Sequence, residues 1–401
     1  MRNRPRTIRT TESLLENGLI DEESLPEIRD VAKRYAVSIT GVMQEQIAHV
    51  DDPVARQFVP TGAELVITPE ERADPIGDDP FTPVKGITHR YPDRLLLKPM
   101  HLCPVYCRFC FRREVVGPGE GMLAQAELEA ALDYIRAHEE VWEVIFTGGD
   151  PLIIAPTKLR PIMAALDAIE HVKVIRFHTR VPVVDPERVT DELVDALATD
   201  TPVWVVVHTN HSQEIGEAAR GALRRLNRGG VPLLSQTVLL RGVNDTPEAL
   251  EGLFRTLVAN RVKPYYLHHG DLAQGTGHFR TTVAEGQELV RRLRGRVSGT
   301  CQPTYVLDIP GGHGKVPIGP SYLEPGEDGT GGTGGTGGGS GGDTHVVTDP
   351  WGERHHYPPR VAAPTAPTAP TAPTAPTAPT APATTPATAT ATDPEEDPTH
   401  D

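Results

Sequence analysis

The sequence predicts an α/β protein with a parallel β-sheet that is either open or rolled into a barrel. The prediction rests on short apolar runs that alternate with longer amphipathic segments from residue 94 onward. Near-continuous apolar strands separated by helices are typical of a parallel sheet with both faces covered. The runs are 94–100, 141–148, 172–179, 203–209, 232–240, 263–269 and 304–310.

Helices are expected between these strands. In segment 124–140, Leu128 and Leu132 fall on one face of a helix, and segments 248–261 and 283–297 show similar spacing. The chemistry of such folds lies at the C-terminal ends of the strands. Several of the candidate residues below fall at or just beyond those ends.

The region before the sheet has a different pattern. Apolar residues spaced three or four apart predict helices within 11–75. A connector rich in Pro, Gly and Asp follows at 73–87. We therefore expect an N-terminal helical region with its connector at 1–86 and one α/β domain at 87–325.

The composition changes again after residue 325. Residues 326–344 are Gly-rich and predict a flexible linker. Residues 345–361 regain strand character and predict a strand that docks back. Residues 362–401 are rich in Ala, Pro and Thr, and their repeated APT triplet predicts a disordered, polyproline-like tail with no catalytic role.

The charge and cysteine content exclude several classes of protein. Lys+Arg 39 against Asp+Glu 54 gives a net charge of −15, which argues against non-specific nucleic-acid binding. No stretch approaches the roughly 20 apolar residues of a membrane span, and no secretory signal begins the chain. Four cysteines in 401 residues are not a disulfide framework. We expect a cytoplasmic protein with no membrane and no nucleic-acid partner.

Three of the four cysteines lie in HLCPVYCRFCFRR, with the spacing C-x3-C-x2-C at Cys103, Cys107 and Cys110. Zinc completed by a residue such as His101, or simply buried thiols, would be alternatives. The fourth cysteine, Cys301, lies just before a different predicted strand. Three thiolates on one loop fit a 4Fe–4S cluster with one iron left open for a small molecule.

This loop resembles that of the radical S-adenosylmethionine (SAM) enzymes. The resemblance implies that Phe109 lies near the adenine of SAM. TGGDPL at 147–152 ends the second strand run, and its adjacent glycines allow close approach of a ligand. The resemblance implies that Gly148, Gly149 and Asp150 hold the amino group of SAM, whereas a plain glycine turn is the alternative.

A lysine stands in the glycine-rich stretch DIPGGHGKVPIGP at 308–320. Lys315 is not part of a Walker loop, because the spacing differs and no Ser or Thr follows it. A lysine on a mobile glycine loop suits covalent attachment of pyridoxal 5′-phosphate (PLP). An exposed turn lysine is the alternative.

Together, these three motifs resemble the lysine 2,3-aminomutase family over about residues 75–320. The resemblance implies a radical-SAM-type partial, open parallel β/α barrel at 87–325. It also implies that Arg90 and Arg94, in ITHRYPDR, hold the PLP phosphate, with Tyr91 beside the ring. Two arginines suit a phosphate as bidentate donors, and surface salt bridges are the alternative.

The family resemblance also assigns the substrate and SAM contacts. It implies that Arg112 binds the substrate carboxylate and that Asp271 and Asp308 bind the side-chain ammonium of lysine. His208 and Gln236 match positions that contact SAM. Without the family pattern, either Asp could be a turn or cap residue, and His208 could be a satisfied strand-end histidine.

The implied activity is the interconversion of L-lysine and β-lysine with a 4Fe–4S cluster, SAM and PLP. A flavodoxin or ferredoxin would supply electrons, and we expect a homo-oligomer. Alternatives are a relative that uses another amino acid or makes β-lysine for an elongation factor, an iron–sulfur or zinc sensor, and a lapsed enzyme. His313 replaces a glycine common in the family, and the C-terminal zinc cysteines of clostridial relatives are absent, so no zinc is predicted.

Overall fold

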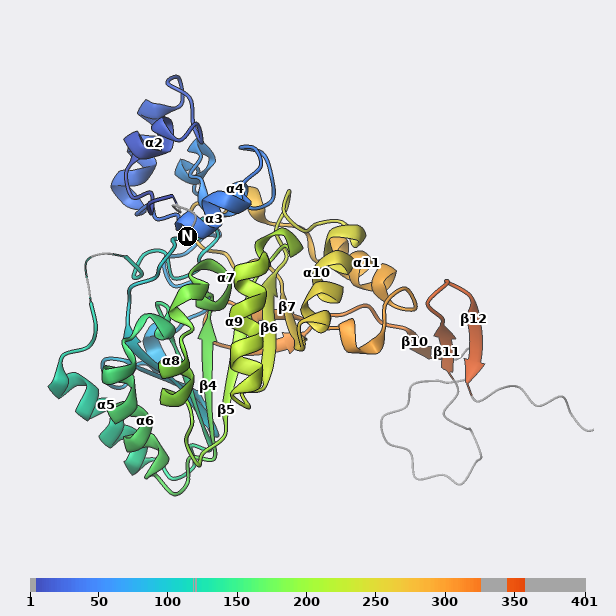
Figure 1. The fold of residues 1–401 in the computed structure, drawn as a ribbon. Coiled ribbons are helices and arrows are strands. Elements are labelled where there is room, and N and C mark those ends of the chain that lie inside the picture. The colour runs from blue at the N-terminus through green and yellow to red at the C-terminus, as the bar shows by residue number, and fades with distance from the viewer. Residues whose placement is uncertain (1–4, 118, 120, 326–344, 358–401) are drawn as a thin grey trace, which may run out of the picture. The chain divides into compact units, whose positions relative to one another are not determined.

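Nine strands lie side by side in chain order in one sheet within the part of the chain that the computed structural model describes (Figure 1). The described residues are 5–117, 119, 121–325 and 345–357. The parallel strands coincide with the predicted apolar runs, so the α/β fold is confirmed. They are β2 (Arg94–Met100), β3 (Glu143–Gly148), β4 (Val174–Thr179), β5 (Val203–His208), β6 (Leu233–Val238), β7 (Val262–His268) and β8 (Thr304–Ile309).

Two antiparallel strands form the edges of this sheet. β1 (Ile87–Tyr91) pairs with β2, and β9 (Gly314–Pro317) pairs with β8. The edges approach each other, because the Lys315 amide on β9 donates to the Tyr91 hydroxyl on β1 at 2.8 Å. The sheet is therefore a nearly closed partial barrel. Lys315, which we expected on a mobile glycine loop, lies within a strand because its segment pairs with β8.

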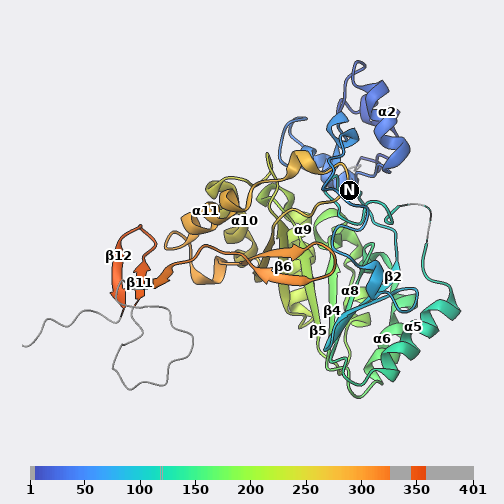
Figure 2. The same cartoon turned by 180° about the vertical axis from the view of Figure 1, so that it is seen from behind.

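Helices cover the outside of the barrel (Figure 1). Figure 2 shows from behind that α10 and α11 lie side by side, as they do in Figure 1. Each helix buries its apolar face, and between strands Phe146 stacks on Phe177 with ring centroids 4.3 Å apart. The outer helices are α5 (Gln125–Ala137), α6 (Pro156–Asp167), α7 (Val181–Val184), α8 (Asp191–Ala196), α9 (Glu217–Arg228), α10 (Pro247–Ala259) and α11 (Val283–Leu293).

The N-terminal region contains short helices rather than long ones. The prediction of helices within 11–75 holds for its first part, whereas residues 66–75 contain no helix. Prolines and glycines interrupt the segment, since proline removes a donor and glycine favours turns. The elements are α1 (Thr11–Glu16), α2 (Leu25–Arg34), α3 (Gly41–Gln46), α4 (Ala55–Phe58) and the 3₁₀ turns η1 (Gly62–Leu65) and η2 (Asp79–Phe81).

A second, three-stranded antiparallel sheet contains β10 (Leu323–Pro325), β11 (His345–Thr348) and β12 (Arg354–Tyr357). The strand character expected at 345–361 thus appears as a hairpin paired with β10. The Gly-rich segment 326–344, residues 358–361 and the tail 362–401 lie outside the described residues. Among the helices that are described, none combines the length and apolar character needed to cross a membrane.

Candidate active site

A cavity of about 1010 Å³ occupies the inside of the barrel. Its wall is built from the strands, the loops that follow them and the segment before β1. The structure brings all the predicted cluster, cofactor and substrate residues to this one cavity. They are Arg90, Tyr91, Arg94, Cys103, Cys107, Phe109, Cys110, Arg112, Gly148, Gly149, Asp150, His208, Gln236, Asp271, Asp308 and Lys315.

The three clustered cysteines follow β2 and line the cavity as free thiols. Burial raises the pKa of Cys103 well above its ordinary value and raises that of Cys110 to about 11. A bound cation is therefore needed to hold these groups as thiolates. Cys301 is buried in the turn before β8 and does not line the cavity. It is not placed to act as a fourth ligand.

The number of thiols favours an iron–sulfur cluster over a single zinc ion. A structural zinc site usually takes four protein ligands. Among the described residues, only three cysteines line the cavity. Three thiolates suffice for a 4Fe–4S cluster that leaves one iron open for a small molecule.

A buried ion network fixes the cysteine loop to the N-terminal region. Glu64 of η1 is fully buried and accepts hydrogen bonds from Arg108 and Arg113, which flank the last cysteine. Burial alone would raise the pKa of Glu64, but the two guanidinium groups outweigh it and lower the pKa. The loop is thus held from behind by a carboxylate that stays ionised.

The two glycines that end β3 are required by close backbone approach. Gly148 has φ +104°, and a Cβ atom there would lie 2.7 Å from the Met100 carbonyl oxygen. A Cβ atom on Gly149 would lie 2.3 Å from the Leu102 carbonyl oxygen. Any side chain here would therefore displace the segment that leads into the cysteine loop.

Asp150 joins the ends of β3 and β4. Its carboxylate accepts from the Thr179 hydroxyl at 2.6 Å and from the amides of Leu152, Arg180 and Val181 at 3.1, 2.7 and 3.1 Å. Burial nevertheless raises the pKa of Asp150, although these donors partly offset the effect. With four internal donors, this carboxylate positions the strand ends, and an incoming amino group would have to compete with them.

Arg180 lies behind the cysteine loop and was not singled out by the sequence. Its guanidinium donates to the Cys107 sulfur at 2.7 Å and to Glu214 at 2.6 Å. It also donates to Gln57 at 2.6 Å. One buried arginine therefore links a proposed cluster ligand to β5's loop and to the N-terminal region.

Lys315 and Asp308 face each other across β8 and β9. The Lys315 ammonium forms an ion pair with Asp308, and it lies 3.2 Å from Nδ1 of His268. Burial alone would raise the pKa of Asp308, but His268 and Lys315 outweigh it and hold the pKa well below its ordinary value. Burial and the charge of Lys315 lower the pKa of His268.

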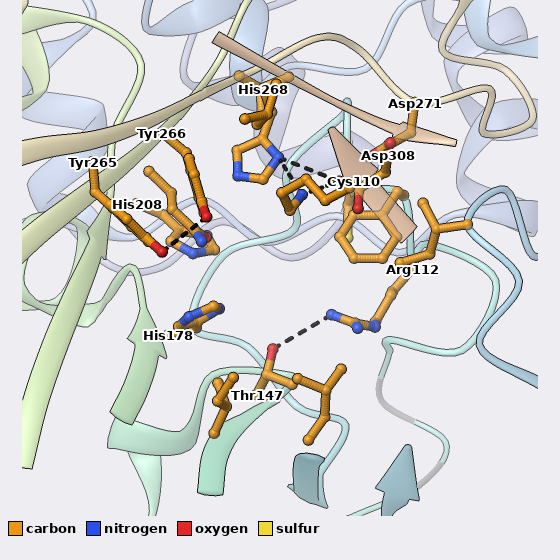
Figure 3. A pocket seen from close by; sticks show the side chains of 18 of the residues that line it. Cys110, Arg112, Thr147, His178, His208, Tyr265, Tyr266, His268, Asp271 and Asp308 are labelled. Atoms are coloured by element: carbon orange, nitrogen blue, oxygen red, sulfur yellow. Dashed lines mark hydrogen bonds and ion pairs between the residues drawn. The ribbon is translucent and has the colours of Figure 1, made fainter. Parts of the chain in front are cut away.

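Asp271 lies near this pair, in the loop after β7 (Figure 3). Burial raises its pKa to about 7, and the charge of Asp308 adds to the effect. The Lys315 charge acts in the opposite direction. The two carboxylates therefore share a region where a second positive charge would be stabilised.

Arg90 and Arg112 share one buried partner, Asp78. Arg90 donates to one oxygen of Asp78 and Arg112 to the other, each at 2.9 Å. Arg112 also contacts the Thr147 hydroxyl at 3.4 Å (Figure 3). Among the described residues, Nε of Arg90 and Nε of Arg112 are buried with no hydrogen-bond partner. Both guanidinium groups can therefore still bind an anionic ligand such as a phosphate or a carboxylate.

Tyr91 lies beside Lys315 at the closing edge of the barrel, and Arg94 packs over the Tyr91 ring. The Arg94 guanidinium lies 3.9 Å from the centroid of the Tyr91 ring, and it also contacts Asp93 at 2.6 Å. The Tyr91 hydroxyl meanwhile accepts from the Lys315 amide. The Tyr91 ring, with Arg94 over it, thus lies next to the strand that carries the lysine, and the cation beside an aromatic ring fits an anionic aromatic cofactor such as PLP.

The residues predicted to contact SAM lie on neighbouring elements. His208 ends β5 and pairs in register with Gln236 on β6. Burial lowers the pKa of His208 to about 3, so the ring is neutral at physiological pH. Phe109, beside the last cysteine, packs edge-to-face on Phe279 with centroids 6.2 Å apart.

Several residues that line the cavity were not predicted from the sequence. Asp78 lies in a connector without periodicity, so only its contacts with two arginines reveal it. His178 and His268 lie at the ends of β4 and β7, and a polar residue at such a position is a usable signal. Tyr265 and Tyr266 join at their hydroxyls, 2.8 Å apart, in the same cavity (Figure 3).

Comparison with known proteins is consistent with this geometry. The Radical SAM superfamily profile matches residues 97–254, and a profile described as lysine-2,3-aminomutase matches residues 290–326. The chain is 41% identical to L-lysine 2,3-aminomutase of Methanococcus maripaludis over 77% of this chain and 73% of that protein. It is 41% identical to the enzyme of the same name from Clostridium subterminale, over 80% and 77%. It is 36% identical to glutamate 2,3-aminomutase of Clostridioides difficile, over 77% and 76%.

Proposed function

Since the chain belongs to the lysine 2,3-aminomutase family of the radical SAM superfamily, we propose that it interconverts L-lysine and L-β-lysine with the help of PLP. As a member of this family, the protein is an isomerase that uses a 4Fe–4S cluster and SAM. Beyond family membership, we propose that the substrate is lysine rather than another amino acid, that PLP is used, and that individual residues have the roles given below.

The observation that carries the choice of substrate is the pair Asp271 and Asp308. Their mutual repulsion contributes to the raised pKa of Asp271. The side-chain ammonium of lysine would relieve that repulsion. The side-chain carboxylate of glutamate would instead add a third negative charge at the same place. The electrostatics therefore favour a basic amino acid over the substrate named for the Clostridioides difficile relative.

The remaining residues of the cavity support a division of labour. Cys103, Cys107 and Cys110 would hold the cluster, and Gly148, Gly149, Asp150, His208, Gln236 and Phe109 would form the SAM contacts. Lys315 would bind PLP covalently, with Arg90, Arg94 and Tyr91 around its phosphate and ring. When bound, the cluster with SAM supplies a carbon-centred radical, and PLP supplies a π-system that stabilises an unpaired electron.

The protein's own contribution is position and exclusion of water. Arg112 would bind the carboxylate of the substrate while Asp271 and Asp308 bind its ammonium. Fixing both ends of one flexible molecule presents its C3 in a single orientation. The barrel wall would keep solvent away from a reactive radical.

The test is anaerobic reconstitution of the cluster, followed by PLP, SAM, a reductant such as a reduced flavodoxin, and one amino acid at a time. We expect β-lysine from L-lysine and no β-glutamate from L-glutamate, measured by amino-acid analysis. Turnover of glutamate without turnover of lysine would contradict the substrate assignment. Turnover of lysine that is unchanged after complete removal of PLP would contradict the cofactor assignment.

A further inference from the structure

A cluster of two histidines and one carboxylate lies outside the cavity. His89 is on β1, His138 directly follows α5, and Glu140 is in the turn before β3. Each offers one potential ligand atom, and these atoms all lie within 4.8 Å of one another. His89 does not line the cavity and contacts Tyr134 of α5 instead, so it lies on the side of β1 that faces this helix.

The hydrogen bond of His138 shows which of its ring nitrogens carries a hydrogen. Its Nδ1 lies 2.6 Å from the carbonyl oxygen of Tyr134. A carbonyl oxygen can only accept, so Nδ1 carries the hydrogen. With the hydrogen on Nδ1, the lone pair of the metal-binding form of the ring lies on Nε2.

Tyr134 also orients the second histidine. Its hydroxyl lies 3.0 Å from Nδ1 of His89, and its ring stacks on His138 with centroids 3.7 Å apart. The two imidazole rings stand nearly perpendicular, with centroids 5.6 Å apart. Histidines that bind metals are usually oriented in this way, by a hydrogen bond at the nitrogen that does not bind the metal.

After these contacts, Nε2 of each histidine and the Glu140 carboxylate remain available to bind a ligand. Within the described part of the chain, no hydrogen bond or ion pair engages Nε2 of His89, Nε2 of His138 or the carboxylate of Glu140. Polar residues on a solvated surface need neither converge on one point nor have their rings oriented by hydrogen bonds. This arrangement therefore indicates a ligand site.

We propose that His89, His138 and Glu140 bind one divalent metal ion of the zinc type, with water as the fourth ligand. Two imidazoles and one carboxylate are an established donor set for zinc, whereas magnesium and calcium prefer oxygen ligands alone. No zinc is predicted from the sequence, which lacks the C-terminal zinc cysteines of clostridial relatives. The ion would fasten β1, whose other face carries Arg90, to the end of α5.

A second group with similar composition does not support such a proposal. Asp349 and His355 are 3.0 Å apart, and Asp349 also accepts from the amides of Trp351 and Glu353 at 2.9 Å each. The Asp349 carboxylate therefore stabilises its own hairpin turn and is not available to a metal ion.

The test measures zinc on the anaerobic, cluster-containing full-length protein. After addition of zinc and gel filtration, we expect one zinc per chain in addition to the iron of the cluster. Zinc X-ray absorption should show only nitrogen and oxygen neighbours at about 2.0–2.1 Å, and no sulfur at about 2.3 Å. Sulfur neighbours would mean that the zinc occupies the cysteine loop, and would overturn the proposal.

Variants test which residues bind the ion. His138→Asn and Glu140→Gln should weaken zinc binding at least about ten-fold, and Tyr134→Phe should weaken it by a similar factor through loss of one orienting hydrogen bond. His171→Asn is the matched control, because His171 also contacts a carbonyl of this helix, that of Ile135 at 3.0 Å, but is not in the cluster.

Zinc should also raise the melting temperature of the wild type and of the control, but not that of Glu140→Gln. Glu140 is exposed, so its variant tests the proposal even if His138→Asn fails to fold. Failure of the wild type to retain zinc, or equal affinity in Glu140→Gln and His171→Asn, would overturn the site.

Discussion

The carboxylate of Asp308 and the ammonium of Lys315 are directly opposed across the β8–β9 ladder and form an ion pair. The same carboxylate lies 3.5 Å from Nδ1 of His268. Under the proposed function, Lys315 would hold PLP and Asp308, together with Asp271, would bind the side-chain ammonium of the substrate. One carboxylate would therefore face both the lysine of the protein and the ammonium of the substrate.

Lys315→Arg separates the charge of this lysine from its chemistry. Arginine keeps the ion pair with Asp308 but cannot bind PLP covalently. We expect a folded protein that shows no PLP adduct after borohydride reduction and no detectable turnover.

Lys263→Arg is the control for this experiment. The Lys263 ammonium donates to the carbonyl oxygens of Pro264 and Gln302, at 3.0 and 2.9 Å, outside the cavity. This variant should keep the adduct. A reducible adduct that persists in Lys315→Arg would show that another lysine binds the cofactor.

The binding of lysine should strengthen as pH rises through about 7. Burial and Asp308 raise the pKa of Asp271 to about 7, so its carboxyl is largely neutral at pH 6 and ionised at pH 8. The substrate's ammonium is positive throughout this range. We expect the KM for lysine to fall between pH 6 and pH 8 in the wild type, measured by steady-state assay.

Asp271→Asn should raise the KM and remove this pH dependence. Asp195→Asn, at the end of α8, is a control that should retain it.

The raised pKa of Asp271 also makes the free energy of unfolding depend on pH. The folded protein keeps this proton up to about pH 7, whereas the unfolded chain loses it near the ordinary value of 3.8. The contribution of Asp271 to stability therefore declines over that window and levels off above it.

Glu64→Gln should destabilise the protein strongly. The change leaves Arg108 and Arg113 buried beside a neutral group, and loss of one partner in a buried ion network costs about 3–5 kcal/mol. Anaerobic urea unfolding measures the loss. Glu248→Gln removes an exposed partner of Arg296 and should change the free energy of unfolding by about 0.5 kcal/mol or less. Equal effects of the two changes would show that the network does not hold the loop.

Gly149→Ala should displace the cysteine loop. The new Cβ atom would lie 2.3 Å from the Leu102 carbonyl oxygen, and backbone must move to relieve the overlap. We expect less iron per chain after reconstitution and SAM binding weakened by about ten-fold or more, a loss of about 1.4 kcal/mol.

Gly221→Ala provides the comparison. Its Cβ atom would lie 4.0 Å from the flexible Arg224 side chain, within α9. Alanine favours a helix over glycine by up to about 1 kcal/mol, so this variant should be as stable as the wild type or more stable. Normal iron content and SAM affinity in Gly149→Ala would contradict the packing argument.

The strands could be predicted from the sequence because each buried strand is a local apolar run. β2, for example, coincides with its run, and Cys103, Cys107 and Cys110 share one loop by covalent spacing alone. The edge strands β1 and β9 were missed because they are short and contain glycine, proline or charged residues. Their pairing depends on neighbours distant in the chain.

The sequence by itself determined the parallel α/β architecture, the cysteine loop and the lysine in its glycine-rich stretch, because periodicity and spacing are local properties. Only the tertiary structure decided that Asp78 holds both Arg90 and Arg112, that Asp150 is occupied by four internal donors, and that His89 faces His138 and Glu140. Such partners are selected by the curvature of the sheet and by burial, which act between residues far apart in the chain. A local sequence pattern cannot predict such long-range contacts.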